Sequence, residues 1–120
     1  MAESVSRIVN SVKPRASMRP RSVFQAKWGK SEEVVAGFKE MAEAMKRIVG
    51  SDRRARILTD LSGPFHTVIQ EFEVESLAEW ERMRAEMFAS PEFQQRQASG
   101  EPPFVGGHMD FWTIEATYGE

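Results

Sequence analysis

The order of helix and strand patterns is the feature of this 120-residue chain that most limits its fold. Short segments rich in strand-forming residues alternate with two segments whose apolar residues recur at helical spacing. The predicted strands are 22–28, 55–60, 66–74 and 108–115, and the predicted helices are 32–49 and a segment from Ser76 that restarts at Ser90. The order β-α-β-β-α-β is that of a ferredoxin-like fold. We therefore predict an α+β protein with one four-stranded antiparallel sheet, strand order 4-1-3-2, and both helices on one face.

Residues with capping preferences mark the ends of the predicted helices. Ser31 is the predicted N-cap of the first helix, and Gly50 follows its last turn as a C-cap. Ser76 and Glu79 have the spacing of a capping box, and Ser90 opens a second helical turn further on. The glycines and prolines from residue 100 to 107 then indicate a loop before the last strand.

The composition excludes several classes of protein. Hydrophobic residues make up 41% and charged residues 28% of the chain, which is typical of a globular domain. Because there are no cysteines, disulfides and thiolate chemistry are excluded, and we expect a reducing, cytoplasmic location. No apolar run approaches the ~18 residues of a membrane span, so no membrane partner is expected.

A basic segment precedes the predicted fold. We divide the chain into an N-terminal arm, 1–21, and a ferredoxin-like domain, 22–120. The arm has a net charge of +4, and the remaining residues have a net charge of −6. The charged residues of the arm are Glu3, Arg7, Lys13, Arg15, Arg19 and Arg21. The arm lacks aromatic residues that stack on bases, which argues against a nucleic-acid partner. It could instead dock on an acidic partner, and its run 7–12 could add an edge strand.

Alternation along the strands divides the side chains between the two faces of the sheet. Val68, Phe72 and Val74 are assigned to the helix side, as are Phe24 and Ala26, and Met109, Phe111 and Thr113 in the last strand. The other face then receives both apolar and charged residues: Val23, Gln25, Lys27, Ile69, Glu71, Glu73, His108, Asp110, Trp112 and Ile114. A face of this mixed character is typical of a subunit interface or a pocket.

Three short segments resemble those of the dimeric α+β barrel proteins. They are Lys27-Trp28-Gly29-Lys30 after the first strand, the segment 72–80, and Ser90-Pro91-Glu92-Phe93 after the second helix. The resemblance covers about residues 22–115 and is closest to the NIPSNAP-like and antibiotic-biosynthesis-monooxygenase-like branch. It implies a homodimer that packs sheet against sheet into an α+β barrel, with a pocket inside the barrel or between sheet and helices. Members of the superfamily include cofactor-free oxygenases, haem-degrading enzymes, isomerases and decarboxylases.

The candidate catalytic residues are His108, Asp110 and Glu71. His108 and Asp110 lie two positions apart on one strand, so they share a face, and a carboxylate beside an imidazole orients it as a general base. Glu71 points to the same face from the third strand and is an alternative carboxylate partner. A hydrogen-bonded polar patch at a dimer interface is the competing interpretation.

The candidate ligand-binding residues are Gln25, Lys27, Ile69 and Trp112, since all four point to the face that the helices leave open. Trp112 could cover a flat ligand or anchor an interface. We expect no metal site, because the two histidines open different strands and point to opposite faces. We also expect no cofactor, since no glycine-rich phosphate motif precedes a helix.

Three functions remain open from the sequence. The first is a homodimer that binds a small apolar or aromatic metabolite without chemistry. The second is a cofactor-independent monooxygenase or isomerase in which His108, with Asp110 or Glu71, acts as the base. The third is an assembly protein whose basic arm docks on an acidic partner, in a dimer or a higher oligomer.

Overall fold

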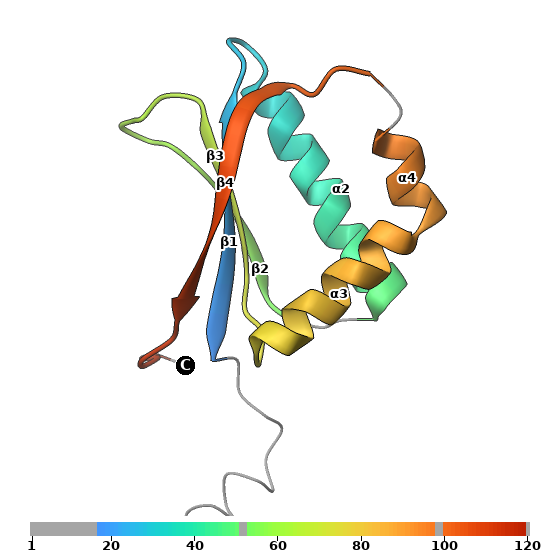
Figure 1. Cartoon of the computed structure of the whole chain (residues 1–120). Coiled ribbons are helices and arrows are strands. Elements are labelled where there is room, and N and C mark those ends of the chain that lie inside the picture. The colour runs from blue at the N-terminus through green and yellow to red at the C-terminus, as the bar shows by residue number, and fades with distance from the viewer. Residues whose placement is uncertain (1–16, 51–52, 98–99, 120) are drawn as a thin grey trace, which may run out of the picture.

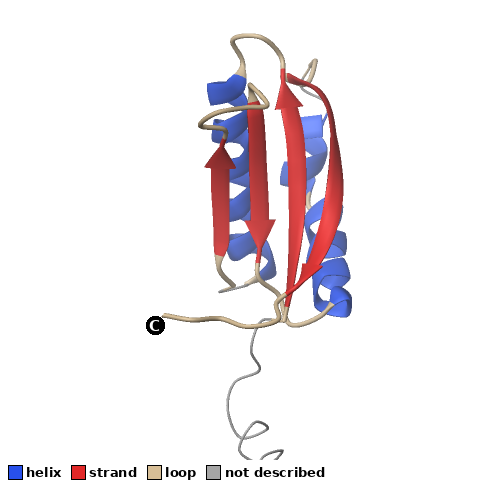
Figure 2. Cartoon of the chain, turned by 90° about the vertical axis from the view of Figure 1, so that its left-hand side faces the viewer, coloured by secondary structure: helices blue, strands red, loops and turns tan. Residues whose placement is uncertain are grey.

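The computed structural model describes residues 17–50, 53–97 and 100–119. The elements follow one another as β1 (Met18–Ala26), α2 (Ser31–Val49), β2 (Ala55–Thr59), β3 (Thr67–Phe72), α3 (Leu77–Ala89), α4 (Pro91–Gln97) and β4 (Phe104–Thr113). The strands form one sheet in the order β2-β3-β1-β4, and each neighbouring pair is antiparallel. The helices cover one face of this sheet (Figure 1), and the described residues leave the opposite face uncovered (Figure 2). The predicted ferredoxin-like α+β fold is confirmed.

The first and the last predicted strands of the chain both begin too late. β1 starts at Met18, four residues before Ser22, so part of the predicted arm lies in the sheet. β4 starts at Phe104 rather than His108, within the predicted glycine-rich loop. The rest of the arm, including the predicted edge strand 7–12, lies outside the described residues. Within the described residues, no helix has the length and apolar character needed to span a membrane.

The helix ends follow the predicted signals with one exception. Gly50 caps α2 with a φ of 75°, and the Ser76 hydroxyl accepts a 3.1 Å hydrogen bond from the Glu79 N–H. The predicted cap at Ser31 is wrong, because α2 is capped at Lys30 and Ser31 lies within the helix. The Ser31 hydroxyl instead lies 3.3 Å from Nδ1 of His66.

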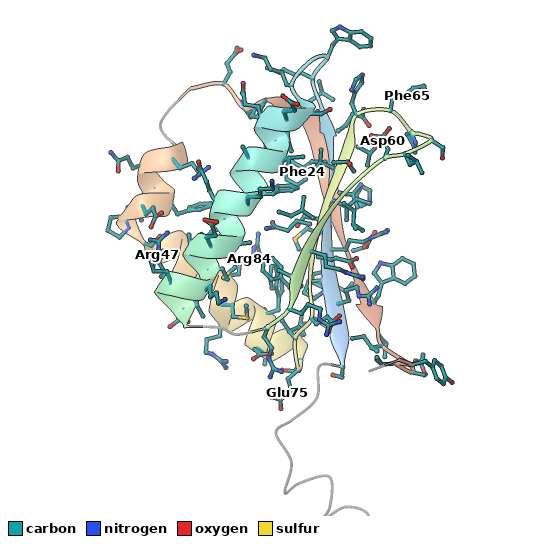
Figure 3. All side chains as sticks on the ribbon, turned by 180° about the vertical axis from the view of Figure 1, so that it is seen from behind. Phe24, Arg47, Asp60, Phe65, Glu75 and Arg84 are labelled. Carbon is teal, nitrogen blue, oxygen red and sulfur yellow. The ribbon has the colours of Figure 1, made fainter. Side chains whose placement is uncertain are left out.

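The core lies between the sheet and the helices and has two parts. Beside the first half of α2, Val68 and Phe38 pack with Ala26 and Val34. Phe24 of β1 lies between the sheet and α2 (Figure 3). Its ring meets that of Phe38 edge to face, with 5.3 Å between the ring centroids. The other part surrounds the aromatic pair Phe72 and Trp80 and contains six of the seven methionines: Met18, Met41, Met45, Met83, Met87 and Met109. Val68, Phe72, Val74 and Met109 thus lie on the predicted side of the sheet. Phe111 lies on that side too, opposite the buried Pro20, but is 48% exposed on its edge strand.

A glycine in β4 allows the close approach of Phe24. Gly107 pairs with Phe24 across the β1–β4 ladder. A Cβ at Gly107 would lie 2.8 Å from both the Phe24 ring and the Val23 carbonyl oxygen. The neighbouring Gly106 has no atom within 4 Å of an equivalent Cβ. The packing of Phe24 therefore requires a glycine at position 107, since a strand glycine often marks a close approach of this kind.

Candidate functional site

The open face of the sheet carries its side chains in rows that cross all four strands. Residues directly opposite in an antiparallel pair point to the same side, so the strand register defines each row. The charged row is Arg56, Glu71, Arg21 and Asp110, from β2 through β3 and β1 to β4. The apolar row beside it is Leu58, Ile69, Val23 and His108. On the other side, Arg54, Glu73, Arg19 and Trp112 form a third row, the tryptophan row.

Asp110 is the centre of the candidate site. Arg21 donates to both of its carboxylate oxygens, from Nε and Nη2, at 2.9 Å each. The Trp112 Nε1–H donates to Oδ1 at 2.6 Å, and Nε2 of His108 lies 3.5 Å from Oδ2. The Arg21 guanidinium also lies 5.3 Å from the centre of the Trp112 ring, within the range of a cation–π contact. Asp110 therefore joins three side chains from two adjacent strands.

These contacts keep Asp110 ionised. The hydrogen bonds from Arg21 lower the pKa of Asp110 from 3.8 to about 2, with a smaller contribution from Trp112 and against the opposing effect of burial. The same hydrogen bond raises the pKa of Arg21. A carboxylate held in this way is a poor proton acceptor at neutral pH. Asp110 can orient a base but is not suited to be one.

His108 is the residue of this group that is open to a ligand. Its side chain is 64% exposed, whereas that of Asp110 is 29% exposed. If Nε2 carries the proton and faces Asp110, the unprotonated Nδ1 is available as an acceptor. Trp112 on the same strand is 54% exposed and presents a flat apolar surface beside it. The pair can therefore combine a proton acceptor with an aromatic contact.

Glu71, the alternative carboxylate, is engaged elsewhere. Its side chain is only 6% exposed and receives a 2.9 Å hydrogen bond from Nε of Arg56. Nη1 of Arg19 lies 3.8 Å from the same Oε1 atom. Glu71 belongs to the row of Asp110, but β1 lies between them, so the two carboxylates are about 10 Å apart. The structure thus brings His108 together with Asp110 and pairs Glu71 with arginines.

The four predicted ligand-binding residues do not form one cluster. Trp112 adjoins His108 and Asp110, and Ile69 lies in the apolar row two strands from His108. Gln25 donates to the Phe65 carbonyl, and Nζ of Lys27 lies 3.6 Å from Glu101. The register places Gln25 six residues along the sheet from the level of Trp112, which is about 20 Å. Gln25 and Lys27 therefore belong to the opposite end of the sheet.

The sequence prediction missed the arginines of the open face. Arg21 and Arg19 were counted with the basic arm, although they point from β1 to the same face as Val23. Arg56 lies in the predicted strand 55–60, but its pairing with Glu71 was not predicted. The alternation that identified Val23 continues back through Arg21 and Arg19, and that signal would have found both.

The other histidine lies away from this group. His66 follows the β2–β3 loop with a φ of 63° and lies beside Ser31, and its ring is 5.0 Å from that of Trp28. Among the described residues, no group of three His, Cys, Asp or Glu side chains is arranged to hold a metal ion.

Comparisons with known proteins identify the fold. Neither a protein-family model nor a curated protein sequence matches the chain. Among solved structures, a NIPSNAP-like domain protein from Burkholderia xenovorans has a TM-score of 0.69 and 18% identity, covering 88% of this chain and 90% of that one. A NIPSNAP family protein of unknown function from Agrobacterium tumefaciens has a TM-score of 0.69 and 13% identity, covering 83% and 89%. A protein described as an antibiotic biosynthesis monooxygenase from Chloroflexus aurantiacus has a TM-score of 0.60 and 16% identity, covering 86% and 98%.

The class that these likenesses define is a structural one. The chain has the ferredoxin-like fold of NIPSNAP-like proteins and of an antibiotic biosynthesis monooxygenase-like protein. The resemblance seen in the sequence is confirmed at the level of the fold. Since fold does not determine function, the activity has to be argued from the site.

Proposed function

We propose that the chain is a homodimeric α+β barrel protein that binds a small apolar or aromatic metabolite beside Trp112 and His108. The observation that carries this proposal is the placement of Trp112 and His108, both more than half exposed, on the sheet face opposite the described helices. Arg21 and Asp110 fix this tryptophan through a cation–π contact and a hydrogen bond. An aromatic ring held this way offers a preformed surface for a flat ligand.

The size of the open face supports the dimer. Four strands about 4.8 Å apart and a nine-residue β1 define a face of roughly 19 by 30 Å. Because side chains stand out from the plane of the sheet, the accessible area of this face exceeds the product of these lengths. It approaches the ~800 Å² per partner of a standard interface. Leu58 is 40% exposed on this face as well. Burial of this area would stabilise two copies against each other.

Native mass spectrometry of the protein purified from its host tests both the dimer and the bound metabolite. We expect a two-chain particle that retains a small molecule, and loss of the retained mass in Trp112→Ala. Trp28→Ala is the matched control, since Trp28 is 87% exposed on the loop after β1. A single-chain particle would contradict the dimer. A retained mass that survives Trp112→Ala unchanged would contradict the binding site.

A second candidate function is a cofactor-independent monooxygenase or isomerase. It is favoured by the 3.5 Å approach of His108 Nε2 to Asp110, which suits a base oriented by a carboxylate. The proton of a phenol or of an acidic carbon would move to Nδ1 of His108 and leave a phenolate or carbanion. An isomerase returns the proton at another atom, whereas an oxygenase requires dioxygen as co-reactant.

Proton exchange separates binding from catalysis. The retained ligand is incubated with the protein in D₂O, and deuterium at its acidic carbon is followed by NMR. For an enzyme we expect exchange to fall by about 100-fold or more in His108→Ala, the usual range for a lost general base. His66→Ala is the control at the remaining histidine. Equal exchange in wild type and His108→Ala would remove His108 from this role.

A further inference from the structure

A second pair of chemically reactive side chains lies at the end of the sheet where α2 begins. Ser31 is the first residue of α2, and its hydroxyl oxygen lies 3.3 Å from Nδ1 of His66. His66 stands directly before β3 in the chain. Both residues are half-buried, which leaves them open to a small molecule. A hydroxyl beside an imidazole is the arrangement that activates a serine as a nucleophile.

We propose that Ser31 is a nucleophile with His66 as its general base, and that the pair hydrolyses esters of small carboxylic acids. This activity is separate from the metabolite binding proposed beside Trp112 and does not depend on it. The two groups share no residue, and a substitution at His66 therefore remains a control for proton exchange at His108.

The hydroxyl of Ser31 is available for this role because it does not cap the helix. A serine at the start of a helix usually accepts a hydrogen bond from an N–H group of the first turn. Here the N-cap is Lys30, whose side chain makes no capping bond, and Ser31 lies one position inside the helix. The Ser31 hydroxyl meets the His66 ring instead, as a nucleophile meets its base.

The position of His66 is fixed by its backbone. Its φ of 63° lies in the left-handed region, which a residue with a side chain adopts at a cost. The His66 carbonyl accepts a 2.8 Å hydrogen bond from the Ala26 N–H, which ties this conformation to β1. One residue earlier, the Phe65 carbonyl accepts from Gln25. Residues held in such conformations cluster at functional sites, and this one sets an imidazole beside Ser31.

The loop that leads to His66 is closed by hydrogen bonds. The Asp60 N–H donates to the Thr67 carbonyl at 3.2 Å, and the Thr67 N–H donates to Oδ1 of Asp60 at 3.0 Å. The Thr67 hydroxyl also donates to the Pro64 carbonyl at 2.8 Å. Figure 3 shows Asp60 and Phe65 on this loop, at the end of the molecule where α2 starts. The loop therefore positions the base against the first turn of α2.

A groove of about 590 Å³ adjoins the serine, between the first half of α2 and the end of β2. This volume is within the range of sites for small molecules. Ser31 lies in its lining, together with Val35 and Ala36 further along the helix. These two side chains give the groove an apolar wall, which suits the hydrocarbon part of an acyl group.

The charged residues of the groove limit the substrate further. The carboxylates of Glu32 and Asp60 outnumber the ammonium group of Lys39 in the lining. This excess of negative charge disfavours an anionic acyl group, because like charges repel. We therefore expect the ester of a short, uncharged carboxylic acid chain as the substrate class.

The first step transfers the acyl group to the enzyme. The Ser31 oxygen attacks the acyl carbon while its proton moves to Nδ1 of His66. The first backbone hydrogen bond of α2 starts at the Val34 N–H, so the earlier N–H groups can donate to the oxygen that becomes negative. The bond from the acyl carbon to the alcohol oxygen then breaks. His66 returns the proton to that oxygen, and the alcohol leaves an acyl-serine behind.

The second step restores the serine. A water molecule attacks the acyl carbon and passes a proton to His66, and the bond to the Ser31 oxygen breaks. His66 returns the proton to Ser31 as the carboxylic acid leaves. An ester and water thus give an acid and an alcohol, and no further reactant is required.

Labelling with diisopropyl fluorophosphate tests the nucleophile directly. The Ser31 oxygen would bond to phosphorus and displace fluoride, while its proton passes to His66. We expect the intact wild-type protein to gain the mass of a diisopropyl phosphoryl group, which peptide mass spectrometry maps to Ser31. Ser31→Ala should lose the label. Ser62→Ala, at an exposed serine of the β2–β3 loop, is the control and should keep it.

Hydrolysis of p-nitrophenyl acetate tests the base. His66→Gly removes the imidazole and supplies a residue that adopts a φ of 63° without strain, so this variant should fold. We expect the rate of hydrolysis to fall by about 100-fold or more, the usual range for a lost general base. Free imidazole added to His66→Gly should restore part of the rate, which a purely structural role of His66 would not produce.

Two results would each overturn this proposal. The first is a wild-type protein in which the fluorophosphate leaves Ser31 unlabelled, and this result requires no variant that might fail to fold. The second is a folded His66→Gly protein, verified by circular dichroism, that is labelled and hydrolyses the acetate ester as fast as wild type.

Discussion

Replacement of Asp110 by asparagine tests the hydrogen-bonded centre of the site. The variant keeps the shape of the side chain but removes its charge and turns one acceptor into a donor. Two Arg21 hydrogen bonds of 2.9 Å and the Trp112 hydrogen bond of 2.6 Å depend on the carboxylate. We therefore expect Asp110→Asn to lower the free energy of unfolding at pH 7.

The magnitude follows from the pKa of Asp110. A decrease from 3.8 to about 2 corresponds to about 2.4 kcal/mol, at 1.36 kcal/mol for each pH unit. Because the side chain is 29% exposed, solvent screening reduces this figure, and we expect a loss of about 1 kcal/mol. A carboxyl group whose folded-state pKa is lowered contributes its full stability above 3.8. That contribution is lost as the pH falls from about 4 to about 2, so the two proteins should converge there.

Urea denaturation at fixed protein concentration, at pH 7 and at steps from pH 4 to pH 2, measures both effects. Glu101→Gln is the control, because Glu101 is 91% exposed and its contact with Lys27 should contribute little. Two results together would refute the assigned role of Asp110. They are equal free energies of unfolding for wild type and Asp110→Asn at pH 7, and the same dependence of that free energy on pH below pH 4.

Three further substitutions test the packing and capping of the fold. Gly107→Ala should cost about 1–3 kcal/mol because its methyl group meets the Phe24 ring, whereas Gly106→Ala should change the urea midpoint little; similar midpoints for the two would contradict the packing argument. Met83→Ala should cost about 2–5 kcal/mol by leaving a cavity at a side chain that is 1% exposed, and a thermal melt unchanged from wild type would contradict its burial. Ser76→Ala should cost about 1 kcal/mol through the lost N-cap of α3, measured by the same melt, and Ser76→Asp should restore it.

The sequence was sufficient to predict the order of elements, since periodicity and caps are local signals. The helix stripes and the Ser76 cap were readable because 3.6-residue spacing and capping chemistry depend on near neighbours. The start of β1 was not readable in this way. Pro20 lacks the N–H that a ladder requires, so a central strand through it is unexpected. Its buried ring on the helix side of β1 is a tertiary effect.

The candidate site was predicted in part for the same reason. His108, Asp110 and Trp112 share one strand, so alternation alone placed them on one face. Arg21 contacts Asp110 from 89 residues away, and only the β1–β4 register brings the two together. The separation of Gln25 from Trp112 is likewise set by register. Local pattern predicts the face of a residue, whereas its neighbours across strands depend on the assembled sheet.

The methionine-rich part of the core has a consequence for oxidative damage. Six thioethers surround Phe72 and Trp80, and those of Met18, Met41 and Met109 are only partly buried. Conversion of one to a sulfoxide would add a polar oxygen to an apolar setting, where an unpaired acceptor is costly. The loosened packing would then open neighbouring sulfur atoms to the same oxidant. Peroxide exposure is therefore expected to damage this protein cooperatively, with the sheet and helices separating at their methionine-lined end first.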